Sequence, residues 1–98
     1  MEKRTPHCPL ERVRLLMSQG KIRTTRAATQ GAHALGLQPR HIFDAVRGLS
    51  SSDFYKSMTT YHDHRYWQDV YHVHTPFGWI YLKLAVVDDV LVVSFKEL

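Results

Sequence analysis

The chain has 98 residues, with 13 lysines and arginines against 9 aspartates and glutamates and a formal net charge of +4. An apolar content of 44% excludes a disordered chain, and the length is that of a single small domain spanning residues 1–98. No apolar run is long enough to cross a membrane, and no apolar segment follows the basic N-terminus, so we expect neither a membrane span nor a signal peptide. The basic balance favours a polyanionic or acidic partner, and the single Cys8, which cannot form an internal disulfide, favours the cytoplasm.

Three helices are predicted in the first half of the chain. Pro9 suits the first turn of a helix and Gly20 the position after its end, and the apolar residues between them recur at helical spacing. A threonine cap opens a second helix, which ends at Gly36 and whose alanines allow close packing. A third helix is expected from Pro39 to about Gly48.

The second half of the chain changes to an alternating pattern rich in aromatic and β-branched residues. Four strands are predicted, at residues 54–60, 67–73, 79–87 and 90–95. Their short connections imply an antiparallel meander, and residues 21–24 indicate a further extended link or edge strand. We therefore expect an α+β fold in which three N-terminal helices pack on one face of a mainly antiparallel β-sheet.

The last hairpin can be given a register. A two-residue turn at 88–89 places Val87 opposite Val90 and gathers the apolar residues on one face. On the other face, this register makes Tyr81 and Lys96 cross-strand neighbours.

The preceding hairpin has a predicted four-residue turn at 75–78. That turn places His72 opposite Tyr81 and brings Gln68 to the same face. It also drives Asp69 onto the apolar face, a conflict that a β-bulge would relieve.

Four polar residues on the four strands are candidates for one shared face away from the core: Lys56, Gln68, Tyr81 and Lys96. The alternation of side chains along the strand at 54–60 does not determine which face of the sheet Lys56 occupies. Metal-free cleavage of RNA needs a base for the 2′-hydroxyl, an acid for the leaving oxygen and cations for the developing charge. Lysines supply the cations, a lysine crowded by other cations can act as a base, a tyrosine can exchange a proton or hold a phosphate oxygen, and a glutamine can orient the substrate. Which lysine is the base stays open.

Other side chains nearby suit single-stranded RNA. Aromatic residues that could stack on unpaired bases are Tyr55, Tyr61, Tyr66, Trp67 and Trp79. Arg65 and Lys83 could hold flanking phosphates. Taken singly, a strand lysine is usually a solvated surface group and a strand tyrosine usually packs against its neighbours. These residues therefore indicate an active site only if they lie together on one face of the sheet.

Two other functions are compatible with the pattern. The pairs His62/His64 and His72/His74 could each chelate zinc with Asp63 or Asp69 nearby, as in a metallohydrolase, although exposed hairpin histidines are the simpler explanation. The basic and aromatic residues would also serve a sheet-based module that binds RNA without cutting it.

Several segments resemble the MqsR toxin family over the full chain: MEKRTPH (1–7), RTTR (23–26), GLS (48–50), DFYKSMTTY (53–61), WQDVY (67–71), YLK (81–83) and VVSFKE (92–97). The resemblance implies a fold similar to RelE and YoeB. It also implies a toxin that cleaves single-stranded mRNA near GCU-type sequences without a metal or other cofactor, and so inhibits translation. The family's active-site Lys, Gln, Tyr and Lys positions fall on Lys56, Gln68, Tyr81 and Lys96, and Tyr55 and Met58 fall on neighbouring positions.

The resemblance also implies a partner. The family is neutralised by MqsA, an antitoxin with a zinc-binding N-terminal domain and a helix-turn-helix domain, so contact with DNA would be only indirect, through the antitoxin. We further hypothesise that His72, which the register places beside Tyr81, contributes to phosphate binding or proton transfer.

Overall fold

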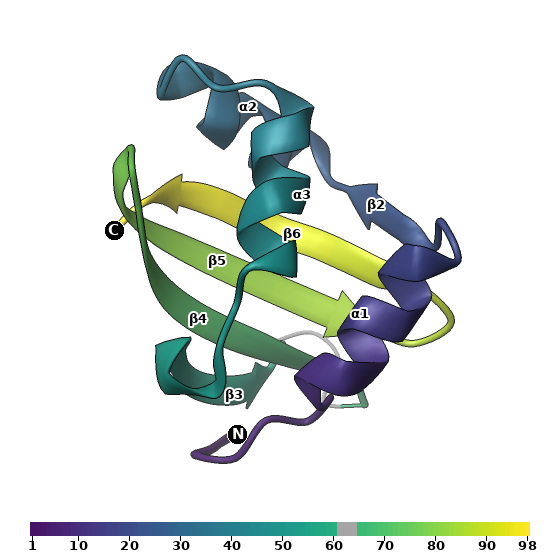
Figure 1. The fold of residues 1–98 in the computed structure, drawn as a ribbon. Helices are drawn as coiled ribbons and strands as arrows, with labels where there is room; N and C mark the ends of the chain where they lie inside the picture. Colours follow the sequence, from purple (N-terminus) through teal and green to yellow (C-terminus); the bar gives the residue numbers. More distant parts are fainter. Residues whose placement is uncertain (61–64) are drawn as a thin grey trace.

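The computed structural model describes residues 1–60 and 65–98, in which three α-helices cover one face of a six-stranded sheet (Figure 1). The helices are α1 (Leu10–Ser18), α2 (Arg26–Ala34) and α3 (Pro39–Arg47), and a short 3₁₀ turn, η1, spans Ser51–Asp53. The strands are β1 (Glu2–Lys3), β2 (Ile22–Thr24), β3 (Phe54–Thr59), β4 (Trp67–Thr75), β5 (Gly78–Val86) and β6 (Val90–Glu97).

The strand order across the sheet is β1-β3-β4-β5-β6-β2. The expected fold, three N-terminal helices on a mainly antiparallel sheet, was wrong in two respects. The helices do not form one N-terminal block, because β1 precedes α1 and β2 separates α1 from α2. The sheet is mixed, because β2 runs parallel to β6. β1 has two residues and β2 has three, too few for an alternating apolar pattern to show in the sequence. Their partners, β3 and β6, lie far away in the chain.

The helix ends follow the local signals in the sequence. Gly20 and Gly36 adopt positive φ angles of 74° and 75° just beyond α1 and α2. The Thr25 side chain caps α2 by accepting a hydrogen bond from the Ala28 amide. At the start of α3, Pro39 occupies the first turn as predicted.

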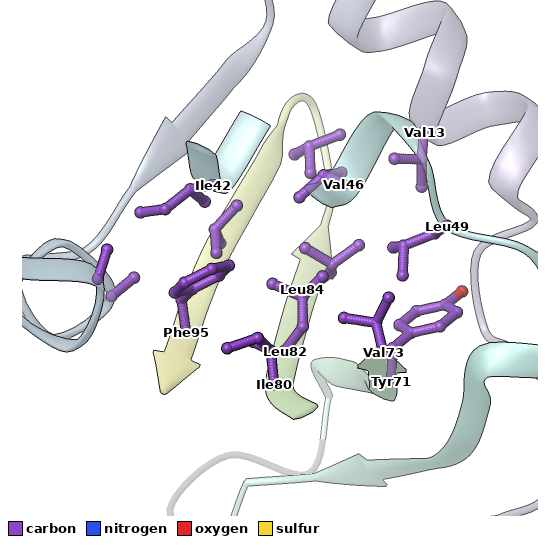
Figure 2. Packing of buried hydrophobic residues seen from close by; sticks show 14 of the residues in the cluster. Val13, Ile42, Val46, Leu49, Tyr71, Val73, Ile80, Leu82, Leu84 and Phe95 are labelled. Atoms are coloured by element: carbon purple, nitrogen blue, oxygen red, sulfur yellow. The ribbon is translucent and has the colours of Figure 1, made fainter. Parts of the chain in front are cut away.

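The apolar core lies between the helices and the sheet. Figure 2 shows side chains of β5 and β6, among them Leu84 and Phe95, pointing toward Ile42 and Val46 of α3. Tyr71 of β4 joins the same cluster. All five side chains are almost fully buried, so this face of the sheet forms the apolar core, whereas the three described helices leave the opposite face uncovered.

The register of the last hairpin is confirmed in the part that matters for the candidate site. Tyr81 pairs with Lys96 as predicted. The predicted two-residue turn is wrong: Val86 pairs with Val90, which makes the turn three residues long. A β-bulge between the pairs Lys83–Ser94 and Leu84–Val92 offsets that extra residue, so the pairs beyond the bulge keep the expected partners.

The hairpin of β4 and β5 places His72 opposite Tyr81, as predicted, but without the β-bulge proposed to keep Asp69 out of the core. Asp69 is instead buried on the core face, with 4% of its surface exposed. Its two carboxylate oxygens accept hydrogen bonds of 2.9 Å from the backbone amides of His7 and Cys8. The N-terminal segment supplies the partners that a buried carboxylate requires.

Replacing Asp69 by alanine is therefore expected to lower the free energy of unfolding by about 2–3 kcal/mol, because two amides lose a charged acceptor. Urea unfolding followed by circular dichroism measures the change. Asp44→Ala is the matched control, since the Asp44 side chain is 65% exposed in its ion pair with Arg47 and should leave the unfolding midpoint unchanged. Equal urea midpoints for the two variants would contradict a stabilising role for the hydrogen bonds of Asp69.

Candidate active face of the sheet

The sheet face turned away from the helices, called here the open face, carries cross-strand rows of polar side chains. One row runs from His72 through Tyr81 to Lys96 across β4, β5 and β6. Because alternate residues of a strand point to opposite faces, this row lies opposite the buried Tyr71 and Leu82.

A second row contains Lys56, Val70 and Lys83, and a third pairs Met58 with Gln68. Lys83 is two residues from Tyr81 along β5, a distance of roughly 7 Å between backbones, and Lys56 lies in the same row as Lys83, two strands away or roughly 10 Å across the sheet. The register brings the four sequence candidates, Lys56, Gln68, Tyr81 and Lys96, to one surface.

A β-bulge decides how Lys56 and Tyr55 reach the open face. The register of β3 shifts between Phe54 and Lys56. Phe54 therefore packs on Tyr71 at the core, with ring centroids 5.6 Å apart, although strict alternation would put Phe54 and Lys56 on the same face. The bulged Tyr55 turns to the open face, where its ring stacks on His72 at 4.2 Å.

Tyr81 lies at the centre of the aromatic and cationic groups. The ring centroids of His72 and Tyr81 are 6.0 Å apart, and the Lys96 Nζ lies 5.2 Å from the centroid of the Tyr81 ring. The sequence prediction that His72 lies beside Tyr81 is thus confirmed as geometry, and its chemical role stays a hypothesis.

Lys56 has a partner that the sequence did not indicate. Its Nζ lies 2.6 Å from the Glu2 Oε1, because β1 pairs with β3 and places Glu2 beside Met58. The hydrogen bond from Lys56 lowers the pKa of Glu2, and the same contact raises the pKa of Lys56. Lys56 is therefore an ammonium at neutral pH. A two-residue strand gives no periodic signal, so nothing in the sequence pointed to Glu2.

Lys83 differs from Lys56 in its protonation behaviour. It is partly buried in the middle of the open face, opposite Ser94. Burial lowers the pKa of Lys83, and the nearby charge of Lys96 lowers it further. The neutral amine of Lys83 is thus available at a lower pH than that of an ordinary lysine.

The remaining candidates divide between the open face and other places. Trp79 is 54% exposed and lies 5.0 Å from the His74 ring on the open face. Trp67 lies on the opposite face of the sheet, where its ring stacks on His7. The Lys3 Nζ lies 4.1 Å from the centroid of the Trp67 ring. Arg65 precedes β4, with its guanidinium 5.5 Å from the centroid of the Tyr66 ring.

The residues considered for zinc do not assemble in the part of the chain that the structure describes. Asp69 points into the core, and His72 and His74 contact different aromatic rings. Within residues 1–60 and 65–98, no three histidine, cysteine or acidic side chains are grouped as metal ligands would be. Tyr61 and the pair His62/His64, with Asp63, lie outside the described residues.

Comparison with known proteins now gives the family. The model of a family described as motility quorum-sensing regulator, toxin of MqsA, matches residues 5–97, which contain all of the open-face candidates except Glu2. The mRNA interferase toxin MqsR of Escherichia coli strain K12 is 55% identical over 97 residues, which cover 99% of each chain. Among the described residues, no helix is long and apolar enough to cross a membrane. The chain belongs to the MqsR toxin family and is a toxin with endoribonuclease activity.

Proposed function

We propose that the open face is the active site, that its substrate is single-stranded mRNA, and that it cuts near GCU-type sequences without a metal. The proposal rests on one observation: Lys56, Lys83 and Lys96 lie on the same sheet face as Tyr81, and the three described helices all lie on the other face (Figure 1). The positive charges of Lys56 and Lys96, with that of Lys83 when it is protonated, favour a phosphodiester and repel a divalent cation. The likeness to an mRNA interferase toxin at 55% identity supports mRNA as the substrate.

The proposed reaction is attack of the 2′-hydroxyl on the adjacent phosphate, which leaves a 2′,3′-cyclic phosphate and a 5′-hydroxyl. Lys56 and Lys96 hold the negative charge that develops on the phosphate oxygens. Tyr81, between His72 and Lys96, passes its hydroxyl proton to the leaving 5′-oxygen. Gln68 orients the ribose or phosphate, and Tyr55, Met58 and Arg65 contact neighbouring nucleotides.

We assign the transfer of the 2′-hydroxyl proton to Lys83, because its lowered pKa makes the neutral amine accessible. Below that pKa the amine is protonated and cannot accept a proton, so the cleavage rate should rise with pH until Lys83 is neutral. Lys83→Arg keeps the positive charge at every pH. This variant should lose that rise, and above the pKa of Lys83 it should be roughly tenfold slower than the wild type. A pH–rate profile of kcat/KM measures the effect, and an unchanged profile would remove Lys83 from the mechanism.

The family assignment supports a proposal for the cellular setting. We propose that residues 1–98 form one toxin domain that acts in the cytoplasm and is neutralised by MqsA, the antitoxin named in the family description. MqsA would carry the zinc site and the helix-turn-helix, so DNA would be reached only through the antitoxin.

The direct test uses a short single-stranded RNA containing one GCU, incubated with the protein in excess EDTA. The expected result is a single cut whose products end in a 2′,3′-cyclic phosphate and a 5′-hydroxyl. Intact RNA that remains bound to the protein would favour a non-catalytic RNA-binding module. Cleavage that EDTA abolishes would contradict the metal-free mechanism.

A further inference from the structure

A groove with a volume of about 420 Å³ opens on the sheet beside the proposed catalytic residues. Its floor is apolar and comes from Ala85, Leu91 and Val93 of β5 and β6. Its wall is the ring of Tyr66, which is 46% exposed. An apolar floor and an exposed aromatic wall form a surface on which a flat, largely apolar group can stack.

The two ends of the groove are polar. Gln68, a member of the proposed active site, lines one end, so the groove continues directly from that site. Arg23 and Asp89 also line it, and they form an ion pair in which the Arg23 Nε lies 2.5 Å and its Nη2 3.3 Å from the two Asp89 oxygens. The pair leaves further guanidinium N–H donors and carboxylate lone pairs, which match the mixed donors and acceptors on the edge of a base.

We propose that this groove binds the nucleobase next to the cleaved phosphodiester, with Tyr66 stacking on its face and the Arg23–Asp89 pair reading its edge. The inference rests on the proposed function of the open face. Charge supports a nucleotide as the occupant: the Arg65 guanidinium lies 5.5 Å from the Tyr66 ring, where it can hold the phosphate attached to a stacked base. Ala85 is two residues from Lys83 along β5, so a base in the groove sits roughly 7 Å along the strand from the lysine row.

The experiment uses a set of single-stranded RNAs with one cleavable bond, every other 2′-hydroxyl being blocked. In each member of the set, one nucleotide is abasic. For the wild-type protein, removing the base that occupies the groove should lower kcat/KM about tenfold, and that position should lie directly beside the cut.

Tyr66→Ala should slow cleavage of the complete RNA and abolish the penalty at that one abasic position. Tyr66→Phe should restore the penalty, because stacking needs the ring and not the hydroxyl. Ala85→Leu, which raises the floor of the groove, gives a second route to the same loss if Tyr66→Ala fails to fold. Phe77→Ala is the matched control, since Phe77 is 53% exposed and lies at the turn between β4 and β5, outside the groove.

The outcomes separate this inference from the proposed function. If the wild-type protein cuts no RNA, the proposed function fails. If it cuts the complete RNA but the abasic penalty is flat, or survives both Tyr66→Ala and Ala85→Leu, the groove is not a base site. If Asp89→Ala alters which base is preferred at that position, the ion pair reads the edge; an unchanged preference would overturn that role.

Discussion

Replacing Lys96 by alanine is expected to lower kcat/KM for RNA cleavage about 10²- to 10³-fold, because the variant loses a cation aimed at the charge that develops on the phosphate. Lys96 stands beside Tyr81 near the end of β6, and among residues 1–60 and 65–98 no carboxylate lies within ion-pair distance of its Nζ. Among the described residues, no carboxylate therefore competes with a substrate for the charge of Lys96. Lys96 is also exposed, so the unfolding midpoint should stay near the wild-type value.

Two comparisons make this test specific. Lys21→Ala removes the same charge from an exposed position before β2 and should leave kcat/KM almost unchanged. Lys56→Ala should cost less than Lys96→Ala, because Glu2 already neutralises part of the Lys56 charge in the free protein. If Lys96→Ala lowers kcat/KM no more than Lys21→Ala does, Lys96 is not part of the proposed site.

The part of this face that could be predicted from sequence is the part that a hairpin fixes. Tyr81 and Lys96 are cross-strand neighbours because a one-residue slip would move Leu82 and Phe95 out of the core. The predicted pairing of Tyr81 with Lys96 is correct although the predicted turn is one residue too short, because a β-bulge near Val93 restores the register. Local alternation and core burial thus determine the pairing more strongly than the turn does.

The features that escaped prediction depend on irregular or distant backbone. A bulge at Tyr55 breaks the parity of β3 and turns both Tyr55 and Lys56 to the open face, and no residue type there signals it. Glu2 reaches Lys56 only because two residues of the N-terminus add to the sheet edge. Asp69 breaks the apolar pattern of β4, and its partners are backbone amides far away in the sequence. Each of these contacts is decided by tertiary structure.

Gly31→Ala is expected to be the most destabilising small substitution, with a loss of roughly 3 kcal/mol in the free energy of unfolding. A methyl group built on Gly31 would lie 1.8 Å from the carbonyl oxygen of Phe95, a distance that no relaxed structure can hold. Gly31 lies in α2, where alanine would ordinarily stabilise the helix by about 1 kcal/mol. The steric clash thus reverses the sign that helix propensity predicts, because α2 must move off β6 and uncover the buried Ala28 and Ala32.

Gly48→Ala is the matched control for Gly31→Ala. Gly48 follows α3 with φ at −87°, and an added methyl group would meet its nearest atom, the Asp44 oxygen, at 3.4 Å. Alanine fits there, so the unfolding midpoint in urea should stay level or rise slightly. The Gly31 methyl would also lie 3.5 Å from the Cβ of Lys96. Gly31→Ala should therefore lower RNA cleavage even at temperatures where it remains folded, whereas Gly48→Ala should not. An unfolding midpoint for Gly31→Ala equal to that of the wild type would contradict the close packing of α2 on β6.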